Sequence, residues 1–116
     1  MNVAANVQGK HILITGGGSG IGAASAKVLC ERGALVGVAD LNLDNAKALA
    51  EALCQAGGKA YAVAVDVTDP EQVKAMFETA YSQHEKVDVV INNAGIDHFP
   101  APLTEVDDAM FMKNIQ

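Results

Sequence analysis

The sequence predicts an α/β fold in which helices cover both faces of a doubly wound parallel sheet. Short apolar runs alternate with segments of helical spacing, and the unit repeats at intervals of roughly 30 residues. The first run leads into a glycine-rich stretch, TGGGSGIG at residues 15–22, which opens the first helical segment. We expect right-handed crossovers between the strands and the Rossmann-like strand order 3-2-1-4.

Four apolar runs have the length and composition of strands that are buried on both faces of a parallel sheet. The predicted strands are 10–15, 34–40, 59–65 and 87–91. In a sheet of this order the first and fourth strands are neighbours. The loops that follow them should therefore open into the same crevice.

The segments between the strands have helical spacing and recognisable ends. A first helix is predicted from Gly20 to about Arg32, with an inward stripe formed by Ile21, Ala24, Ser25, Val28 and Leu29. Asn42 is the predicted N-cap of a second helix, which Gly57 and Gly58 end. The inward residues of this second helix are predicted to be Ala46, Leu49, Ala50 and Leu53.

A third helix has the clearest start in the chain. Asp69 is a suitable N-cap, Pro70 suits the first helical position and Gln72 the third. Its predicted inward residues are Val73, Met76, Phe77, Ala80 and Tyr81. A last helical pattern begins at about Glu105 and continues to Gln116. We expect these elements to form a single domain over residues 1–116.

Composition and charge exclude several classes of protein. Half of the 116 residues are apolar and 19% are charged, which is typical of a globular protein. The net charge of −6 offers no basic patch to a nucleic-acid backbone. The sequence contains no recognisable signal peptide or membrane span, so we expect a cytoplasmic protein. Cys30 and Cys54 are predicted to be free thiols, and no metal site is predicted.

The glycine-rich stretch is the first candidate functional feature. It follows a strand and opens a helix, so the unpaired N–H groups of the first helical turn face the space above the sheet. Side chains at Gly16, Gly20 and Gly22 would obstruct the turn, the approach of a phosphate, or the packing of the helix on the strand. The alternative is an ordinary tight turn. The context favours a Rossmann-like loop that binds the pyrophosphate of a dinucleotide.

Asp40 is a second and independent indication. It ends the second predicted strand 18 residues after Gly22, near the spacing at which a carboxylate accepts hydrogen bonds from the adenosine ribose. The alternative is a carboxylate that caps the next helix. A carboxylate here would repel a 2′-phosphate, and neither Ser19 nor Leu41 supplies a positive charge. The sequence therefore predicts NAD rather than NADP.

With these residues the chain resembles the short-chain dehydrogenase/reductase family, whose pattern T-G-x-x-x-G-I-G is matched in full by Thr15–Gly22. The resemblance implies that Asp66 and Val67 meet the adenine ring and that the NNAG stretch, 92–95, lines the cofactor cleft. Without the resemblance, Asp66 and NNAG would be read as turn residues. The predicted cofactor-binding residues are Thr15, Gly16, Ser19, Gly20, Ile21, Gly22, Asp40, Leu41, Asp66, Val67, Asn93, Ala94 and Gly95.

The resemblance also implies a catalytic tetrad, of which Asn114 is the only match in this chain. The acid–base pair of the family is Tyr-x-x-x-Lys on one helix face, with a serine beside it. Val65 stands four residues after Tyr61, and Glu85 four residues after Tyr81, so neither tyrosine has that lysine. The chain is therefore similar to the N-terminal, cofactor-binding half of an oxidoreductase, truncated before the remaining tetrad residues and inactive alone.

Two other readings stay open. The chain could be a stand-alone dinucleotide-binding or regulatory module, or a structural remnant that only self-associates. The outer edge of the fourth predicted strand would be unpaired without a fifth strand, which predicts strand-mediated self-association, a swapped partner or a missing C-terminal half. We expect a homo-oligomer. In a full-length dehydrogenase the further partner would be a small alcohol or carbonyl substrate. Among the histidines, only His98 is predicted to lie near the cleft.

Overall fold

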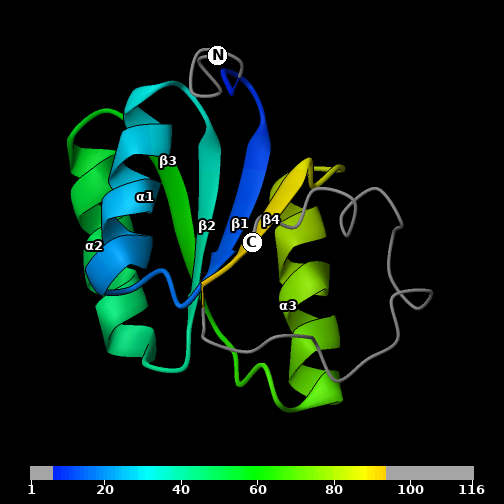
Figure 1. Cartoon of the computed structure of the whole chain (residues 1–116). Helices are drawn as coiled ribbons and strands as arrows, with labels where there is room; N and C mark the ends of the chain where they lie inside the picture. The colour runs from blue at the N-terminus through cyan, green and yellow to red at the C-terminus, as the bar shows by residue number, and fades with distance from the viewer. Residues whose placement is uncertain (1–6, 94–116) are drawn as a thin grey trace.

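A computed structural model describes residues 7–93, which form one parallel sheet with helices on both faces (Figure 1). The elements in chain order are β1 (His11–Thr15), α1 (Gly20–Glu31), β2 (Leu35–Asp40), α2 (Leu43–Gln55), β3 (Lys59–Ala64), α3 (Pro70–Gln83) and β4 (Val89–Asn92). The strand order is β3-β2-β1-β4, and every pair is parallel. The predicted fold class and strand order are confirmed. The predicted helix from Glu105 lies outside the described residues.

The register brings the carboxyl ends of all the strands to one edge of the sheet. Thr15 lies opposite Ala39 on one side and Asn92 on the other, and Asp40 lies opposite Ala64. The glycine loop and the segments that follow β2, β3 and β4 therefore leave the sheet at the same edge (Figure 1). We call this end of the sheet, where the strands end, the carboxyl edge, and the opposite end, where the strands begin, the amino edge. Neither name refers to the outer strands β3 and β4.

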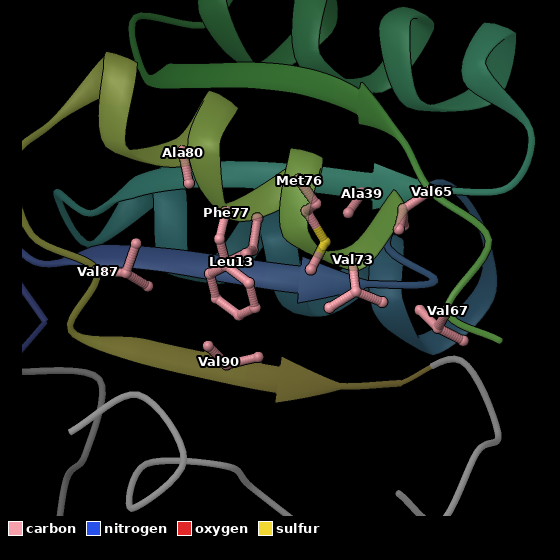
Figure 2. Close-up of a cluster of buried hydrophobic side chains, with 10 residues drawn as sticks. All are labelled: Leu13, Ala39, Val65, Val67, Val73, Met76, Phe77, Ala80, Val87 and Val90. Carbon is pink, nitrogen blue, oxygen red and sulfur yellow. The ribbon is translucent and has the colours of Figure 1, made fainter. Parts of the chain in front are cut away.

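Each face of the sheet has its own hydrophobic core. Helix α3 covers one face, where Leu13 and Val90 of the sheet meet Val73, Met76 and Phe77 of the helix (Figure 2). Helices α1 and α2 cover the other face (Figure 1). Buried residues of this second core are Val7, Ile12, Ile14, Ala26, Cys30, Ala34, Val36, Val38, Ala46 and Leu53. Because both faces are covered, the strands are apolar throughout rather than alternating.

The two predicted helix caps are present. The Asn42 side chain accepts a hydrogen bond from the backbone N–H of Asn45 at 3.0 Å, and Asp69 accepts one from that of Glu71 at 3.0 Å. Pro70 occupies the start of α3, where its missing N–H costs nothing. Both helices therefore begin where the sequence predicts.

The predicted inward stripe of α1 is wrong at Ile21, Ala24 and Val28, which are exposed, whereas Leu29 is partly buried and packs against the second core. The residues that α1 buries are Gly22, Ala26 and Cys30, whereas Ile21 is 77% exposed and Val28 is 46% exposed. Small residues face the sheet because α1 packs closely against the end of β1 at Gly22. The prediction took the largest aliphatic side chains as the inward ones. These lie mainly on the neighbouring face of α1.

The inward stripe of α3 is correct except at one residue. Val73, Met76, Phe77 and Ala80 are buried, but Tyr81 is 36% exposed. Tyr81 follows Ala80 directly, so it lies about 100° further round the helix, at the border of the buried face.

Several predicted features can be checked only within residues 7–93. In this part of the chain no helix is long and apolar enough to span a membrane. The same residues contain no group of three or more potential metal-ligating side chains. Cys30 is buried and Cys54 is exposed, and both are free thiols as predicted.

Candidate functional site

A cavity of about 440 Å³ lies at the carboxyl edge of the sheet. It is lined by residues from all four strand ends and the glycine loop: Gly16, Ser19, Asp40, Leu41, Val65, Asp66, Val67, Thr68 and Asn93. Seven of these were predicted from the sequence, and only Val65 and Thr68 were missed. Thr68 had a detectable signal, since it stands two residues after Asp66, where a side chain bonds to an aspartate turn.

The remaining predicted residues do not line this cavity. Thr15 is fully buried below it, and the Ile21 side chain instead borders an apolar groove between α1 and β4. Gly20 and Gly22 instead determine the backbone conformation and packing of the glycine loop. Ala94, Gly95 and Asn114 lie outside the described residues.

The glycine loop needs glycine for two different reasons. Gly16 and Gly20 have φ values of +66° and +60°, in the left-handed region that side chains disfavour. A Cβ at Gly22 would collide with the Gly16 carbonyl oxygen and would lie 2.7 Å from Asn93 Nδ2. A Cβ at Gly20 would meet no heavy atom within 4 Å, so the space beside that glycine is open.

The start of α1 differs from the starts of the other two helices. Its N-cap residue, Ser19, makes no side-chain hydrogen bond to the first turn, and the first turn contains no acidic residue. Asn42 and Asp69, in contrast, cap their helices. The N–H groups and positive dipole end of α1 are therefore left for an anion at the mouth of the cavity.

Asp40 connects the glycine loop to the start of α2. Its Oδ2 accepts a hydrogen bond from the Gly18 N–H at 2.8 Å, and its Oδ1 accepts one from the Asn42 N–H at 2.9 Å. A Cβ at Gly18 would lie 2.8 Å from Asp40 Oδ2, so a side chain there would displace the carboxylate. Each carboxylate oxygen can still accept a second hydrogen bond from a ligand in the cavity.

Thr15 connects the glycine loop to the segment after β4. Its hydroxyl donates to Asn92 Oδ1 at 3.0 Å and accepts from the Asn93 N–H at 3.1 Å. The Asn93 side chain in turn donates from Nδ2 to the Gly16 carbonyl oxygen at 3.4 Å. These bonds hold the two loops against each other beneath the cavity.

Asp66 forms the wall opposite the glycine loop. Its Oδ1 accepts hydrogen bonds from the hydroxyl of Thr68 at 2.6 Å and from the Thr68 N–H at 3.0 Å. These two bonds, the hydroxyl first, lower the pKa of Asp66 below its ordinary value. The wall therefore carries a carboxylate anion at neutral pH.

No described tyrosine is placed for acid–base work in this cavity. Tyr61 donates its hydroxyl to His11 Nε2 at 2.6 Å, and burial raises the pKa of this phenol far above its ordinary value. Tyr81 lies on α3, outside the cavity lining. Within residues 7–93 the cavity thus offers the N–H donors of a helix start and carboxylate acceptors but no phenol.

The family model for short chain dehydrogenases matches residues 10–116. The chain belongs to the short-chain dehydrogenase family. The chain is 42% identical over 104 residues to the cis-4-hydroxycyclohexanecarboxylate dehydrogenase of Sinomonas cyclohexanicum, a match that covers 90% of this chain and 41% of that protein. The chain thus spans about two-fifths of that relative's length.

Two further members of the short-chain dehydrogenase family illustrate the range of lengths. A Haemophilus influenza protein solved with bound NAD, and described provisionally as a D-mannonate oxidoreductase, matches with a TM-score of 0.75 and 33% identity, over 84% of this chain and 35% of its own. The short-chain dehydrogenase/reductase homolog YusS of Bacillus subtilis (strain 168) is 39% identical over 97 residues, which cover 82% of this chain and 89% of YusS. Members of both lengths therefore share this region.

Proposed function

We propose that the carboxyl-edge cavity binds NAD and that the chain is the cofactor-binding unit, over residues 1–116, of an NAD-dependent oxidoreductase. The observation that carries the proposal is the uncapped start of α1, which opens into the same cavity as Asp40. An anion-binding helix end and a carboxylate acceptor are the two groups that a pyrophosphate and its neighbouring ribose require.

The residues present fit a dinucleotide. The open space beside Gly20 and the free first turn of α1 would take the pyrophosphate. Asp40 would accept the ribose hydroxyls, and Leu41, Asp66 and Val67 would surround the base. Ala94 and Gly95 lie outside the described residues and stay predicted cofactor-binding residues through the family resemblance. When bound, the nicotinamide would accept or donate the hydride that is exchanged with an alcohol or carbonyl substrate.

The chain's own groups bind and orient the cofactor but do not complete the chemistry. Hydride transfer needs a proton donor or acceptor at the substrate oxygen. Neither tyrosine of the sequence has a lysine four residues further on, and Asn114 would be the only tetrad residue. We therefore propose that the chain is inactive alone, in the cytoplasm, and a homo-oligomer, since within residues 7–93 strand β4 pairs with β1 only.

NAD is proposed over NADP because of charge. The Asp40 carboxylate, held by the N–H groups of Gly18 and Asn42, would lie against a 2′-phosphate. Calorimetric titration of the 116-residue chain should show NAD binding at least about ten-fold tighter than NADP. Asp40→Asn should reduce the difference between the dissociation constants of NAD and NADP. Asp44→Asn, at the exposed start of α2, is the matched control. Absence of binding of either dinucleotide at millimolar concentration would overturn the proposal.

A second function is favoured by one observation, the match to 89% of YusS. A relative of this length is consistent with a stand-alone dinucleotide-binding or regulatory module. As under the first proposal, the purified chain would bind NAD without forming NADH from any of a panel of secondary alcohols. Size-exclusion chromatography with and without NAD would separate such a module from a remnant that only self-associates, whose oligomer should be indifferent to the cofactor.

A further inference from the structure

The turn between β3 and α3 uses all but one of its backbone donors internally. Asp66 N–H donates to Gln72 Oε1 at 2.9 Å, Thr68 N–H to Asp66 Oδ1 at 3.0 Å, and Asp69 N–H to the Asp66 carbonyl oxygen at 3.0 Å. Within residues 7–93 the N–H of Val67 has no acceptor. Val67 lines the cavity and is 7% exposed as a residue, and its N–H is the one donor of the turn that is left for a ligand.

This turn therefore presents a donor beside an acceptor. The donor is the Val67 N–H, and the acceptor is Asp66 Oδ2, because Oδ1 already takes both bonds from Thr68. The apolar side chain of Leu41, 75% exposed, lines the same cavity. Adenine has a flat apolar face and an edge on which an acceptor nitrogen adjoins an amino donor, so it complements both features.

Gln72 holds this turn from behind. It extends from the first turn of α3, accepts the Asp66 N–H with Oε1, and donates from Nε2 to Asp69 Oδ2 at 3.2 Å. Gln72 itself does not line the cavity. We propose that Gln72 is a positioning residue that sets the Asp66–Val67 pair for the base of the dinucleotide, an inference that rests on the proposed function.

The start of α3 does not depend on Gln72. The helix is capped by the bond between Asp69 Oδ1 and the Glu71 N–H, and Pro70 occupies its first position. Gln72 is exposed, so its truncation removes little buried surface. Loss of its amide frees the Asp66 N–H to bond to water and lets the turn move, while the helix stays capped. The expected consequence is on base recognition rather than on folding.

The test is calorimetric binding to the full 116-residue chain of NAD and of its hypoxanthine analogue. Hypoxanthine reverses the donor and acceptor on the edge that faces Asp66 and Val67. Gln72→Ala should weaken NAD binding by about three- to ten-fold, the effect of one hydrogen bond, and should leave the analogue almost unchanged. Gln72→Glu keeps the acceptor for the Asp66 N–H but replaces the donor to Asp69 Oδ2 by a second carboxylate, so it should restore part of the preference for adenine. Glu71→Ala, the exposed neighbour in the same turn, is the matched control.

The outcomes separate the two proposals. If the wild-type chain binds neither dinucleotide, the proposed function fails and Gln72 has no base to position. If the wild type prefers NAD and Gln72→Ala keeps the same preference, or loses both ligands equally, the inference about Gln72 is wrong. Should Gln72→Ala not fold, Gln72→Met, which keeps the side-chain length without the acceptor, gives the same comparison.

Discussion

The two edges of the sheet both carry buried or half-buried polar groups, but they use them differently. At the carboxyl edge, Asp40 and Asp66 each bond to their own loops while leaving acceptor positions directed to a cavity. At the amino edge, His11 and Tyr61 bond to each other. The first arrangement is prepared for a ligand, and the second is complete without one.

The amino edge closes its network around a fully buried histidine. His11 Nδ1 lies 3.0 Å from the Lys86 carbonyl oxygen, which can only accept, so we assign the proton of the neutral ring to Nδ1. Nε2 then accepts from the Tyr61 hydroxyl at 2.6 Å. The backbone N–H of His11 donates to Asp88 Oδ2 at 2.9 Å. Every polar atom of the imidazole is satisfied, which is what a buried polar group needs.

Gly37 makes this pairing possible. It lies on β2, between Leu13 of β1 and Tyr61 of β3 in the register of the sheet. A Cβ at Gly37 would collide with the Tyr61 hydroxyl. The tyrosine therefore crosses over the glycine to reach His11, two strands away. Polar side chains at the carboxyl or amino edge therefore indicate a binding site only where some of their donors or acceptors are not used by the protein itself.

The largest expected effect is at the carboxyl edge, at Gly22. We expect Gly22→Val to lower the free energy of unfolding by about 3 kcal/mol and to abolish NAD binding, because the new side chain collides with the Gly16 carbonyl oxygen. Urea unfolding and calorimetry measure the two effects. Gly20→Asn is the matched control for stability only, since asparagine tolerates positive φ and no heavy atom lies within 4 Å of that Cβ position, whereas its side chain would enter the space proposed for the pyrophosphate. Near-wild-type stability of Gly22→Val would contradict the close packing of α1 on β1.

The second-largest effect should be a loss of stability at the amino edge, without a change in NAD binding. Tyr61→Phe removes the donor to the buried His11 Nε2 and should lower the free energy of unfolding by about 2 kcal/mol, with NAD affinity unchanged. Adding His11→Phe removes the unpaired nitrogen, so the double variant should cost less than the sum of the two single variants. Additive losses in urea unfolding would show that the two rings are not coupled.

Thr15→Val tests whether the loops of the carboxyl edge depend on each other. The substitution keeps the shape of the side chain but removes the hydroxyl that bonds to Asn92 Oδ1 and to the Asn93 N–H. We expect a loss of about 1 kcal/mol in stability together with a several-fold loss in NAD affinity. Thr15→Ser keeps the hydroxyl and should bind NAD like the wild type. If Thr15→Val loses stability but keeps its NAD affinity, the bonds between the two loops do not contribute to the binding site.

The smallest effect is a dependence on pH that belongs to the amino edge. Burial, aided by the nearby His84, lowers the pKa of His11 below its ordinary 6.5 and outweighs the opposing influence of Lys86 and Asp88. Below pH 6.5 the unfolded chain therefore binds a proton that the folded chain does not, and stability falls as the pH falls. We expect a loss of up to about 1 kcal/mol between pH 6.5 and pH 5.

Urea unfolding across this range of pH gives the measurement. The His11→Phe/Tyr61→Phe double variant lacks the titrating ring and should show a flatter dependence. A His84→Gln variant should keep most of the slope, since burial rather than His84 is the main cause of the lowered pKa. An unchanged slope in the double variant would assign the pH dependence to other groups.

The sequence predicts repeated and local features well. Alternating apolar runs with helical spacing identify the sheet, and asparagine, aspartate and proline identify the starts of α2 and α3, because capping depends on residues within one turn. The glycine loop and Asp40 identify part of the cavity lining, and the family resemblance identifies Asp66, Val67 and Asn93. The α1 stripe fails, because which helix face is buried depends on how closely the helix approaches the sheet.

From the sequence come the fold class, through the periodicity of its apolar residues, and the glycine loop and Asp40, through local turn chemistry. The strand order and the roles of Asp66, Val67 and Asn93 come from the Rossmann-like and family patterns. Only the tertiary structure shows which of those residues form hydrogen bonds within the protein and which keep free donors or acceptors. The link of Asp40 to Gly18 spans two loops, and that of Gln72 to Asp66 joins a helix to the turn before it. His11 meets a tyrosine 50 residues away. Such pairings depend on the distance and direction between side chains in space, which no spacing along the chain specifies.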